Sequence, residues 1–163
     1  MFSQTTEYAI RAAIDIGTRP EGERVLAAQL GEVLGIPAHY LSKILQQLVR
    51  ARILSSVRGR GGGFMLARPA AKITLQQIVS PFEDLRKYDE CIMGQTVCSD
   101  AGACPLHDFW GGIRTRYLDE LNKRTLKDLS NYQLMRIAKM GAGLRNKLPT
   151  VPGMDTWRGA RKA

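Results

Sequence analysis

The sequence ILSSVRGRGGGFML, residues 53–66, decides the fold. Two apolar runs, Ile53–Val57 and Phe64–Leu66, flank a glycine-rich tip that contains Arg58 and Arg60. Short apolar runs bounded by glycine predict two strands, and the glycines between them predict a flexible hairpin tip. Glycine also allows the backbone to approach another surface closely. We therefore expect a β-hairpin whose tip presents two positive charges to its partner.

Three predicted helices lead up to this hairpin. The spacing of apolar residues predicts helices over Ser3–Gly17, Val25–Leu34 and Pro37–Ala51. Gly35 and Pro37 interrupt the chain between the second helix and the third, which gives a helix, a short turn and a helix. A helix pair followed by a basic hairpin predicts a winged helix-turn-helix that binds DNA. An ordinary hairpin is the alternative, and so is a nucleotide-cradling loop, although no Gly-Lys-Ser/Thr follows.

The positive charge of the chain is concentrated in the same region. The net charge is +9, and a basic balance favours a polyanionic partner. From Gly35 to Pro81 there is no acidic residue. The basic residues of this interval are Lys43, Arg50, Arg52, Arg58, Arg60, Arg68 and Lys72. Arg58 and Arg60 can neutralise phosphates or enter a minor groove.

The composition excludes several other classes of protein. With 44% hydrophobic and 24% charged residues, the chain is typical of globular proteins. No apolar run is long enough to predict a membrane span, and the first residues lack the apolar centre of a signal peptide. We therefore expect a cytoplasmic protein. The two histidines, His39 and His107, and scattered acids form no nucleophile–base set, so no enzyme is predicted.

The second half of the chain predicts further helices. Thr74–Gln77 has the spacing of a capping box, and longer helices are expected from about Pro105 to Lys123 and from Thr125 to about Met140. Their candidate packing residues are Trp110, Ile113, Tyr117 and Leu121 in the first, and Leu126, Leu129, Leu134 and Ile137 in the second. The first set recurs at spacings of three and four, which predicts a seam between subunits or on the same domain. A two-fold DNA operator favours the homodimer.

The expected protein is mainly α with a small β-hairpin wing, a winged helix-turn-helix domain plus a long dimerisation helix. Four segments are expected: the DNA-binding domain (residues 1–83), a cysteine-rich cluster-binding loop (84–108), the dimerisation helix and the following helix (109–140), and a basic, disordered tail (141–163).

The expected loop holds four soft or borderline metal ligands, Cys91, Cys98, Cys104 and His107. An odd number of cysteines in a chain without a signal peptide argues against a disulfide framework. Zinc accepts thiolates and imidazole, but its sites usually contain closely spaced cysteine pairs. The wider spacing here suits a larger iron–sulfur cluster. Metal-free thiols or a thiol redox sensor remain the alternative.

The helix pair, the sequence SSVRGRGGG (residues 55–63) and the three-cysteine loop together resemble the Rrf2 family of transcriptional regulators, in particular its iron–sulfur members of the IscR and NsrR type. The resemblance covers residues 1–138, without the tail. It implies a homodimeric winged-helix repressor on double-stranded DNA. It also implies that an iron–sulfur cluster sets the operator affinity by sensing nitric oxide, redox state or the supply of iron and clusters.

The resemblance also implies a ligand set. Cys91, Cys98 and Cys104 match the cluster cysteines of the family, although the first gap is one residue longer than in IscR-like members. His107 keeps the spacing at which IscR-like proteins supply a histidine to a 2Fe-2S cluster. Glu7 falls where some NsrR-like proteins place an aspartate ligand for a 4Fe-4S cluster, from the partner subunit. The tethered His107 favours 2Fe-2S, with 4Fe-4S as the alternative.

For DNA contact, the resemblance points to the start of the third helix and to the wing. The expected residues are His39, Tyr40, Ser42, Lys43, Arg58 and Arg60, and Tyr40 could instead belong to the core. A metal-free thiol-based or zinc-containing regulator is the alternative function. An iron–sulfur electron-transfer or cluster-assembly protein would explain the cysteines but not the basic helix pair and wing.

Overall fold

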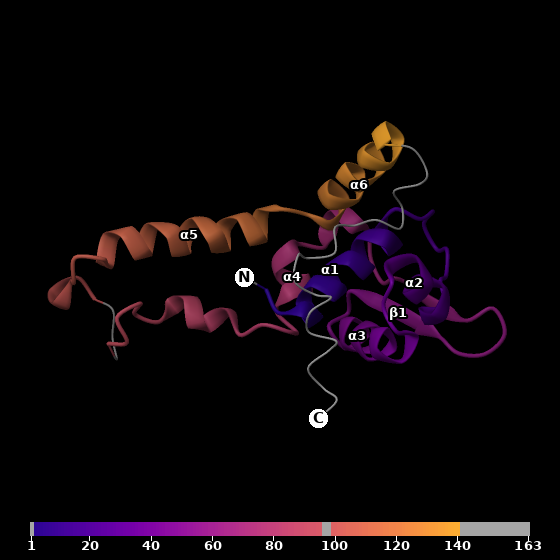
Figure 1. The fold of residues 1–163 in the computed structure, drawn as a ribbon, viewed down its shortest axis with the longest axis horizontal. Coiled ribbons are helices and arrows are strands. Elements are labelled where there is room, and N and C mark those ends of the chain that lie inside the picture. The colour runs from indigo at the N-terminus through magenta and orange to yellow at the C-terminus, as the bar shows by residue number, and fades with distance from the viewer. Residues whose placement is uncertain (1, 96–98, 141–163) are drawn as a thin grey trace, which may run out of the picture.

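The computed structural model describes residues 2–95 and 99–140. In chain order the elements are α1 (Gln4–Gly17), α2 (Ala27–Leu34), α3 (Ala38–Arg50), β1 (Leu54–Val57), β2 (Gly63–Leu66), η1 (Ala70–Lys72), α4 (Leu75–Val79), η2 (Leu85–Asp89), η3 (Asp100–Gly102), α5 (His107–Lys123) and α6 (Leu126–Met140). Figure 1 shows a body that contains the hairpin and most of the helices, and a long α5 that projects from it. The mainly α fold with a β-hairpin is confirmed. Cys98 and the predicted tail lie outside the described residues.

α1 begins at a side-chain cap, because the Ser3 hydroxyl accepts a hydrogen bond from the Thr6 backbone N–H. Its buried apolar face consists of small residues and one isoleucine, namely Ala9, Ala12, Ala13 and Ile16. The larger apolar residues Tyr8, Ile10 and Ile14 are half-buried and pack against the same core. Alanines let the neighbouring helices approach α1 closely, and the larger side chains lie at the margins.

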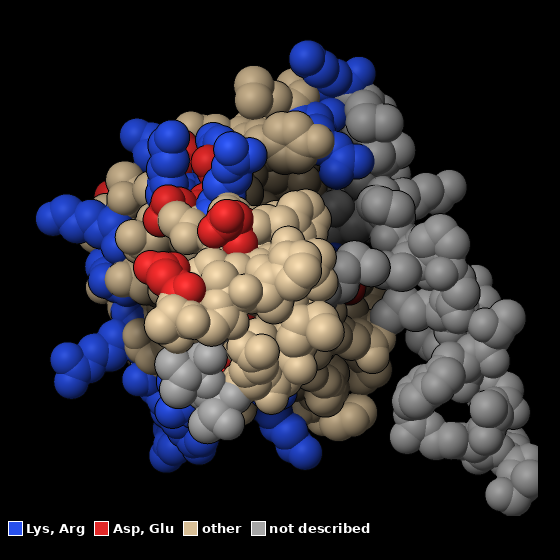
Figure 2. All heavy atoms as spheres, turned by 90° about the vertical axis from the view of Figure 1, so that its left-hand side faces the viewer, with Lys and Arg blue, Asp and Glu red and all other residues tan. Residues whose placement is uncertain are grey.

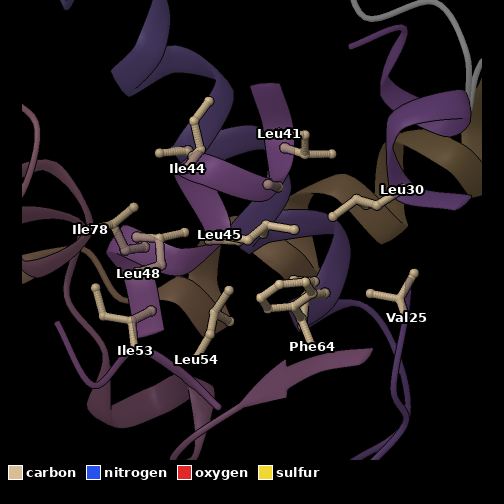
Figure 3. Close-up of a cluster of buried hydrophobic side chains, with 14 of the residues drawn as sticks. Val25, Leu30, Leu41, Ile44, Leu45, Leu48, Ile53, Leu54, Phe64 and Ile78 are labelled. Carbon is tan, nitrogen blue, oxygen red and sulfur yellow. The ribbon is translucent and has the colours of Figure 1, made fainter. Parts of the chain in front are cut away.

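The core forms around the buried side of α3, where residues of α1, α2 and the wing pack together. Leu41, Ile44, Leu45 and Leu48 line one side of α3 and are buried, as the helical spacing predicted. Figure 3 shows this stripe together with Leu30 of α2 and Phe64 of β2, two of its neighbours in the core. Gly35 ends α2 with a φ of +67°, a left-handed conformation that turns the chain sharply into α3. The helix-turn-helix thus rests on a continuous apolar core.

The wing is a two-stranded antiparallel hairpin. β1 pairs with β2 from Leu54 opposite Leu66 to Val57 opposite Gly63. On the other edge of β2, the Val25 N–H donates to the Phe64 carbonyl at 3.0 Å, and the Phe64 N–H donates back at 2.9 Å. Val25 was predicted to begin a helix, but this non-local pairing holds it extended, so α2 starts two residues later. The β2 edge of the wing is therefore fixed to the body near its base.

Gly63 allows this close approach of Val25. Its φ is +141°, and a Cβ there would lie 2.8 Å from the Val25 carbonyl oxygen. We expect Gly63→Ala to lower the free energy of unfolding by about 1–3 kcal/mol, measured by denaturant titration. Gly61→Ala is the matched control, because its φ is +72° but a Cβ would meet nothing within 4 Å. Equal losses for the two variants would contradict the role of the Val25 contact.

The last helix returns to the body. The Leu126 N–H donates to the Ile73 carbonyl at 2.7 Å, and the Ser130 hydroxyl donates to the Ile14 carbonyl of α1 at 3.3 Å. Of the predicted anchors of α6, Leu126 is buried while Leu129 and Ile137 are half-buried. Leu134 was a wrong prediction, since 45% of it is exposed. The capping box is confirmed by hydrogen bonds in both directions between Thr74 and Gln77.

Most of the predicted seam of α5 packs against its own chain. Leu121 is buried, and the Tyr117 ring lies 4.8 Å from that of Tyr88. The Trp110 Nε1–H donates to the Glu90 carbonyl at 3.0 Å. Only Ile113 of this seam is exposed. The segment that follows α4 therefore runs alongside α5, as Figure 1 shows. No helix in residues 2–95 or 99–140 is long and apolar enough to cross a bilayer.

Candidate nucleic-acid interface and cysteine loop

One face of α3 is polar and exposed along the whole helix. His39, Lys43, Gln46 and Arg50 recur at spacings of three and four, which places them on one side of an α-helix, and all four are exposed. This side faces away from the buried stripe of Leu41, Ile44, Leu45 and Leu48. The arrangement suits insertion of α3 into a major groove, because basic and amide side chains bind phosphates and base edges.

A shallow groove runs between this face and the start of α1. Thr5, Lys43 and Gln47 are among its lining residues. Tyr40 lies at its wall, half-buried, and its hydroxyl forms a 2.6 Å hydrogen bond with the Thr5 hydroxyl. Ser42 also lines this groove, and its hydroxyl donates a hydrogen bond to the Ala38 carbonyl at 2.8 Å. Of the residues expected from the helix, His39 and Lys43 thus have the most exposed side chains.

The wing carries the other expected contacts. Arg58 and Arg60 are exposed at the hairpin tip, where the Gly62 N–H donates to the Gly59 carbonyl and closes a tight turn. Figure 1 shows that the tip extends from the side of the body opposite α5. The two arginines are thus far from the cysteine loop in space, although the loop follows the wing in sequence.

The two described cysteines are both tied to the start of α5. Cys91 is buried and follows Glu90, whose carbonyl accepts the Trp110 indole hydrogen bond. Cys104 is half-buried, and its carbonyl accepts a 2.9 Å hydrogen bond from the His107 N–H. Both ends of the loop are therefore held near the first turns of α5. The third cysteine lies outside the described residues.

His107 is the first residue of α5 and lies on the same side as Trp110, three residues later. Its Nε2 is 3.0 Å from an oxygen of Asp100, and its side chain is only 19% exposed. Thiolates and imidazole are the ligand types of iron–sulfur centres, so the donor set fits such a cluster. Within residues 2–95 and 99–140, no three Cys, His, Asp or Glu side chains come together at a possible metal site.

Glu7 lies elsewhere. It belongs to the first turn of α1 and is half-buried. Figure 1 places α1 in the body, whereas the cysteine loop lies near the far end of α5. The structure does not bring Glu7 together with the cysteines of its own chain.

Comparison with known proteins agrees with this geometry. The model of the Rrf2 family, described as "Iron-dependent Transcriptional regulator", matches residues 2–132. The chain belongs to the Rrf2 family. The HTH-type transcriptional regulator IscR of Escherichia coli O1:K1 / APEC is 31% identical over 126 residues, which cover 77% of each chain. A putative HTH-type transcriptional regulator of Aquifex aeolicus is 30% identical over 135 residues, which cover 82% of this chain and 93% of the relative.

A solved structure shares the fold of this Rrf2 protein. CymR (YrzC), described as the global cysteine regulator of Bacillus subtilis, superposes with a TM-score of 0.67 at 23% identity, over 81% of this chain and 97% of CymR. This likeness shows the winged-helix fold. The relatives are DNA-binding transcriptional regulators and not enzymes, as the sequence predicted. The chain is therefore a DNA-binding transcriptional regulator of the Rrf2 family.

Four exposed residues were not among the DNA contacts expected from the sequence, although Arg50 was counted in its basic interval: Arg24, Gln46, Gln47 and Arg50. Helical spacing counted onward from Lys43 would have found the three on α3. Arg24 could not be found in this way, because its Nη1 donates to the Gly61 carbonyl at 3.2 Å. That contact depends on the pairing of the neighbouring Val25 with β2, which no local pattern reveals.

Proposed function

We propose that this Rrf2 regulator is a repressor whose operator affinity is controlled by an iron–sulfur cluster on the loop from Cys91 to His107. One observation carries the proposal: Trp110 and His107, at the start of α5, hold the segments of Cys91 and Cys104 through hydrogen bonds to the backbone. A loop fixed at both ends to a rigid helix can bring its thiols to one centre. A cluster bound there would supply one-electron redox chemistry and reactivity toward nitric oxide or oxygen.

The proposed ligands are Cys91, Cys98, Cys104 and His107, with a 2Fe-2S cluster. His107 suits the fourth position because it follows Cys104 by three residues, and its Nδ1 could bind iron while its Nε2–H donates to Asp100. Glu7 is the alternative fourth ligand of a 4Fe-4S cluster. Since α1 and the cysteine loop are separated within one chain (Figure 1), Glu7 could serve only a cluster of the partner subunit.

The proposed DNA contacts are divided between α3 and the wing. His39 and Lys43 would enter the major groove from the exposed face of α3, together with the half-buried Ser42 beside them. Arg58 and Arg60 would contact phosphates or a narrow minor groove. Tyr40 borders the protein's shallow groove between α3 and α1, and its hydroxyl is bound to Thr5. Any contact of Tyr40 with DNA would therefore come from the edge of its ring.

The proposed partner of α5 is a second copy of this chain. Leu106, Phe109 and Ile113 are exposed on one side of the helix, with 62% of Phe109 accessible. Ile92 and Met93, directly after Cys91, are exposed as well. Figure 2 looks onto this end of the molecule, where uncharged side chains cover much of the centre, several Asp and Glu lie beside them, and Lys and Arg lie mainly around the edge. Apolar surface of this kind on a projecting helix favours a homodimer on a two-fold operator.

A charge on this surface should separate the subunits. We expect Phe109→Asp to shift the protein from dimer to monomer in sedimentation equilibrium, because a carboxylate would be buried without a partner. Met135→Asp is the matched control, since Met135 is 56% exposed on α6. A Phe109→Asp protein that remains dimeric at the concentrations at which the wild type is dimeric would contradict this interface.

The cluster is tested by anaerobic purification, with iron, sulfide, absorption and native mass measured for each chain before and after nitric oxide or oxygen. A colourless protein without iron would overturn the cluster proposal. A metal-free thiol-based regulator would then be favoured. The DNA-binding part of the proposal is tested by measuring salt-dependent binding to duplex DNA. The absence of such binding would favour an electron-transfer or cluster-assembly protein.

A further inference from the structure

The first turn of α1 lies between the DNA-binding helix and the segment that leads to the cysteine loop. On one side, the Thr5 hydroxyl is 2.6 Å from the Tyr40 hydroxyl of α3. On the other side, a carboxylate oxygen of Glu83 accepts hydrogen bonds from the Ser3 N–H at 2.7 Å and from the Thr6 hydroxyl at 2.6 Å. Residues 3–6 therefore contact both regions directly.

The contact with α3 has a defined geometry. The Tyr40 ring meets the Tyr8 ring edge-on, with 6.1 Å between the centroids, and the hydroxyl–hydroxyl bond fixes the end of the side chain. Tyr40 directly follows His39 and lies one turn before Lys43, the two proposed base-reading residues. The orientation of the first turn of α3 against α1 thus depends on Tyr40 and Thr5.

The contact with Glu83 is stronger than an ordinary surface hydrogen bond. Its acceptor is charged, which shortens and strengthens both bonds, and Thr6 is fully buried. Glu83 precedes η2, in which Tyr88 packs on Tyr117 of α5 at 4.8 Å. Phe2, next to Ser3, lies 6.3 Å from the same Tyr117 ring. The Tyr117 ring of α5 therefore packs near both the segment that leads to Cys91 and the residues just before α1.

We infer that Thr5 and Glu83 are positioning residues for DNA recognition: Thr5 sets the orientation of α3 through Tyr40, and Glu83 ties α1 to the segment before Cys91. Tyr40 then acts as a support and not as a base reader. The role of Thr5 is independent of the cluster. The role of Glu83 rests on the proposed function, because a change in the cysteine loop would reach α1 through Glu83.

The Thr5 role is tested with Thr5→Val, Tyr40→Phe and the double variant in duplex titrations. Each single variant should weaken binding about 3- to 10-fold, the equivalent of one net hydrogen bond. The double variant should lose no more than either single one, because both changes remove the same bond. Thr18→Val is the control, since the Thr18 hydroxyl bonds only to Asp15 at the other end of α1 in the described chain. Additive losses, or none, would overturn the role.

The Glu83 role is tested by comparing duplex affinity with the cluster intact and removed. Glu83→Gln keeps the shape of the side chain but removes its charge. The ratio between the duplex affinities of the cluster-containing and cluster-free forms should fall to half of the wild-type ratio or less. Asp84→Asn is the matched control, because Asp84 pairs with the exposed Arg86. Thr6→Val removes one donor and should act in the same direction, which keeps the test valid if Glu83→Gln does not fold. A full wild-type ratio in both variants would overturn the role, whereas a wild-type ratio of one would refute the proposed sensing itself.

Discussion

Replacement of Cys104 by serine should abolish assembly of the cluster, leaving the anaerobically purified protein without the iron, sulfide and visible absorption expected of the wild type. The thiolate is the ligand that iron–sulfur clusters require, and a serine hydroxyl is a poor substitute because it remains protonated at neutral pH. Cys104 is half-buried and its carbonyl binds the His107 N–H, so serine should preserve the backbone. Iron content and the absorption spectrum are the measurements.

Variants of the same loop make this expectation specific. Cys91→Ser and Cys98→Ser should have the same effect, while Ser99→Ala should leave the cluster intact. A wild-type spectrum in Cys98→Ser would remove that residue from the ligand set. His107→Ala and Glu7→Ala distinguish the two candidates for the fourth ligand, because only the variant that lacks a true ligand should change the spectrum.

Removal of both wing arginines should cause the largest loss of operator affinity. Arg58 and Arg60 are exposed on a tip whose base is fixed by the Val25–Phe64 pairing, so they can reach DNA without reorganisation of the hairpin. Each replacement by alanine is expected to cost about 1–3 kcal/mol if the residue contacts a base or a narrow groove. A phosphate contact would instead lower the salt dependence of binding, by about one in the log–log slope. Duplex titrations at several salt concentrations measure both effects.

Arg86→Ala is the control for this pair of changes. Arg86 is also exposed, but it pairs with Asp84 in the segment after α4, away from the wing. Its removal should leave specific binding unchanged. Operator affinity that is unaffected by loss of both Arg58 and Arg60 at physiological salt would contradict the role of the wing.

Local signals explain why most of the fold could be predicted from the sequence. The Ser3 cap, the Thr74 capping box and Gly35 each set a boundary through contacts within a few residues. Non-local contacts explain the errors. Val25 was assigned to a helix because its partner, Phe64, is distant in sequence. Leu134 fits a helical apolar pattern, but α6 meets α1 near Leu126 and Ser130 in its first turns, and Leu134, one turn further on, is exposed.

The candidate sites show the same division. The spacing of Cys91, Cys98, Cys104 and His107 predicted a ligand loop, but the contact of Trp110 with Glu90, which ties the segment of Cys91 to α5, is visible only in three dimensions. Likewise, helical spacing marked the exposed face of α3. The hydrogen bond that commits Tyr40 to α1 joins residues 35 positions apart, so no pattern within the helix could reveal it.

The central claim is that the state of the cysteine loop sets the affinity for DNA. The most direct measurement is the dissociation constant for one operator duplex, at fixed salt, with the same protein preparation before and after controlled removal of the cluster. The account predicts that the two constants differ and that Cys104→Ser has the constant of the cluster-free protein. Equal constants for the three forms, with the cluster confirmed in the first, would contradict it.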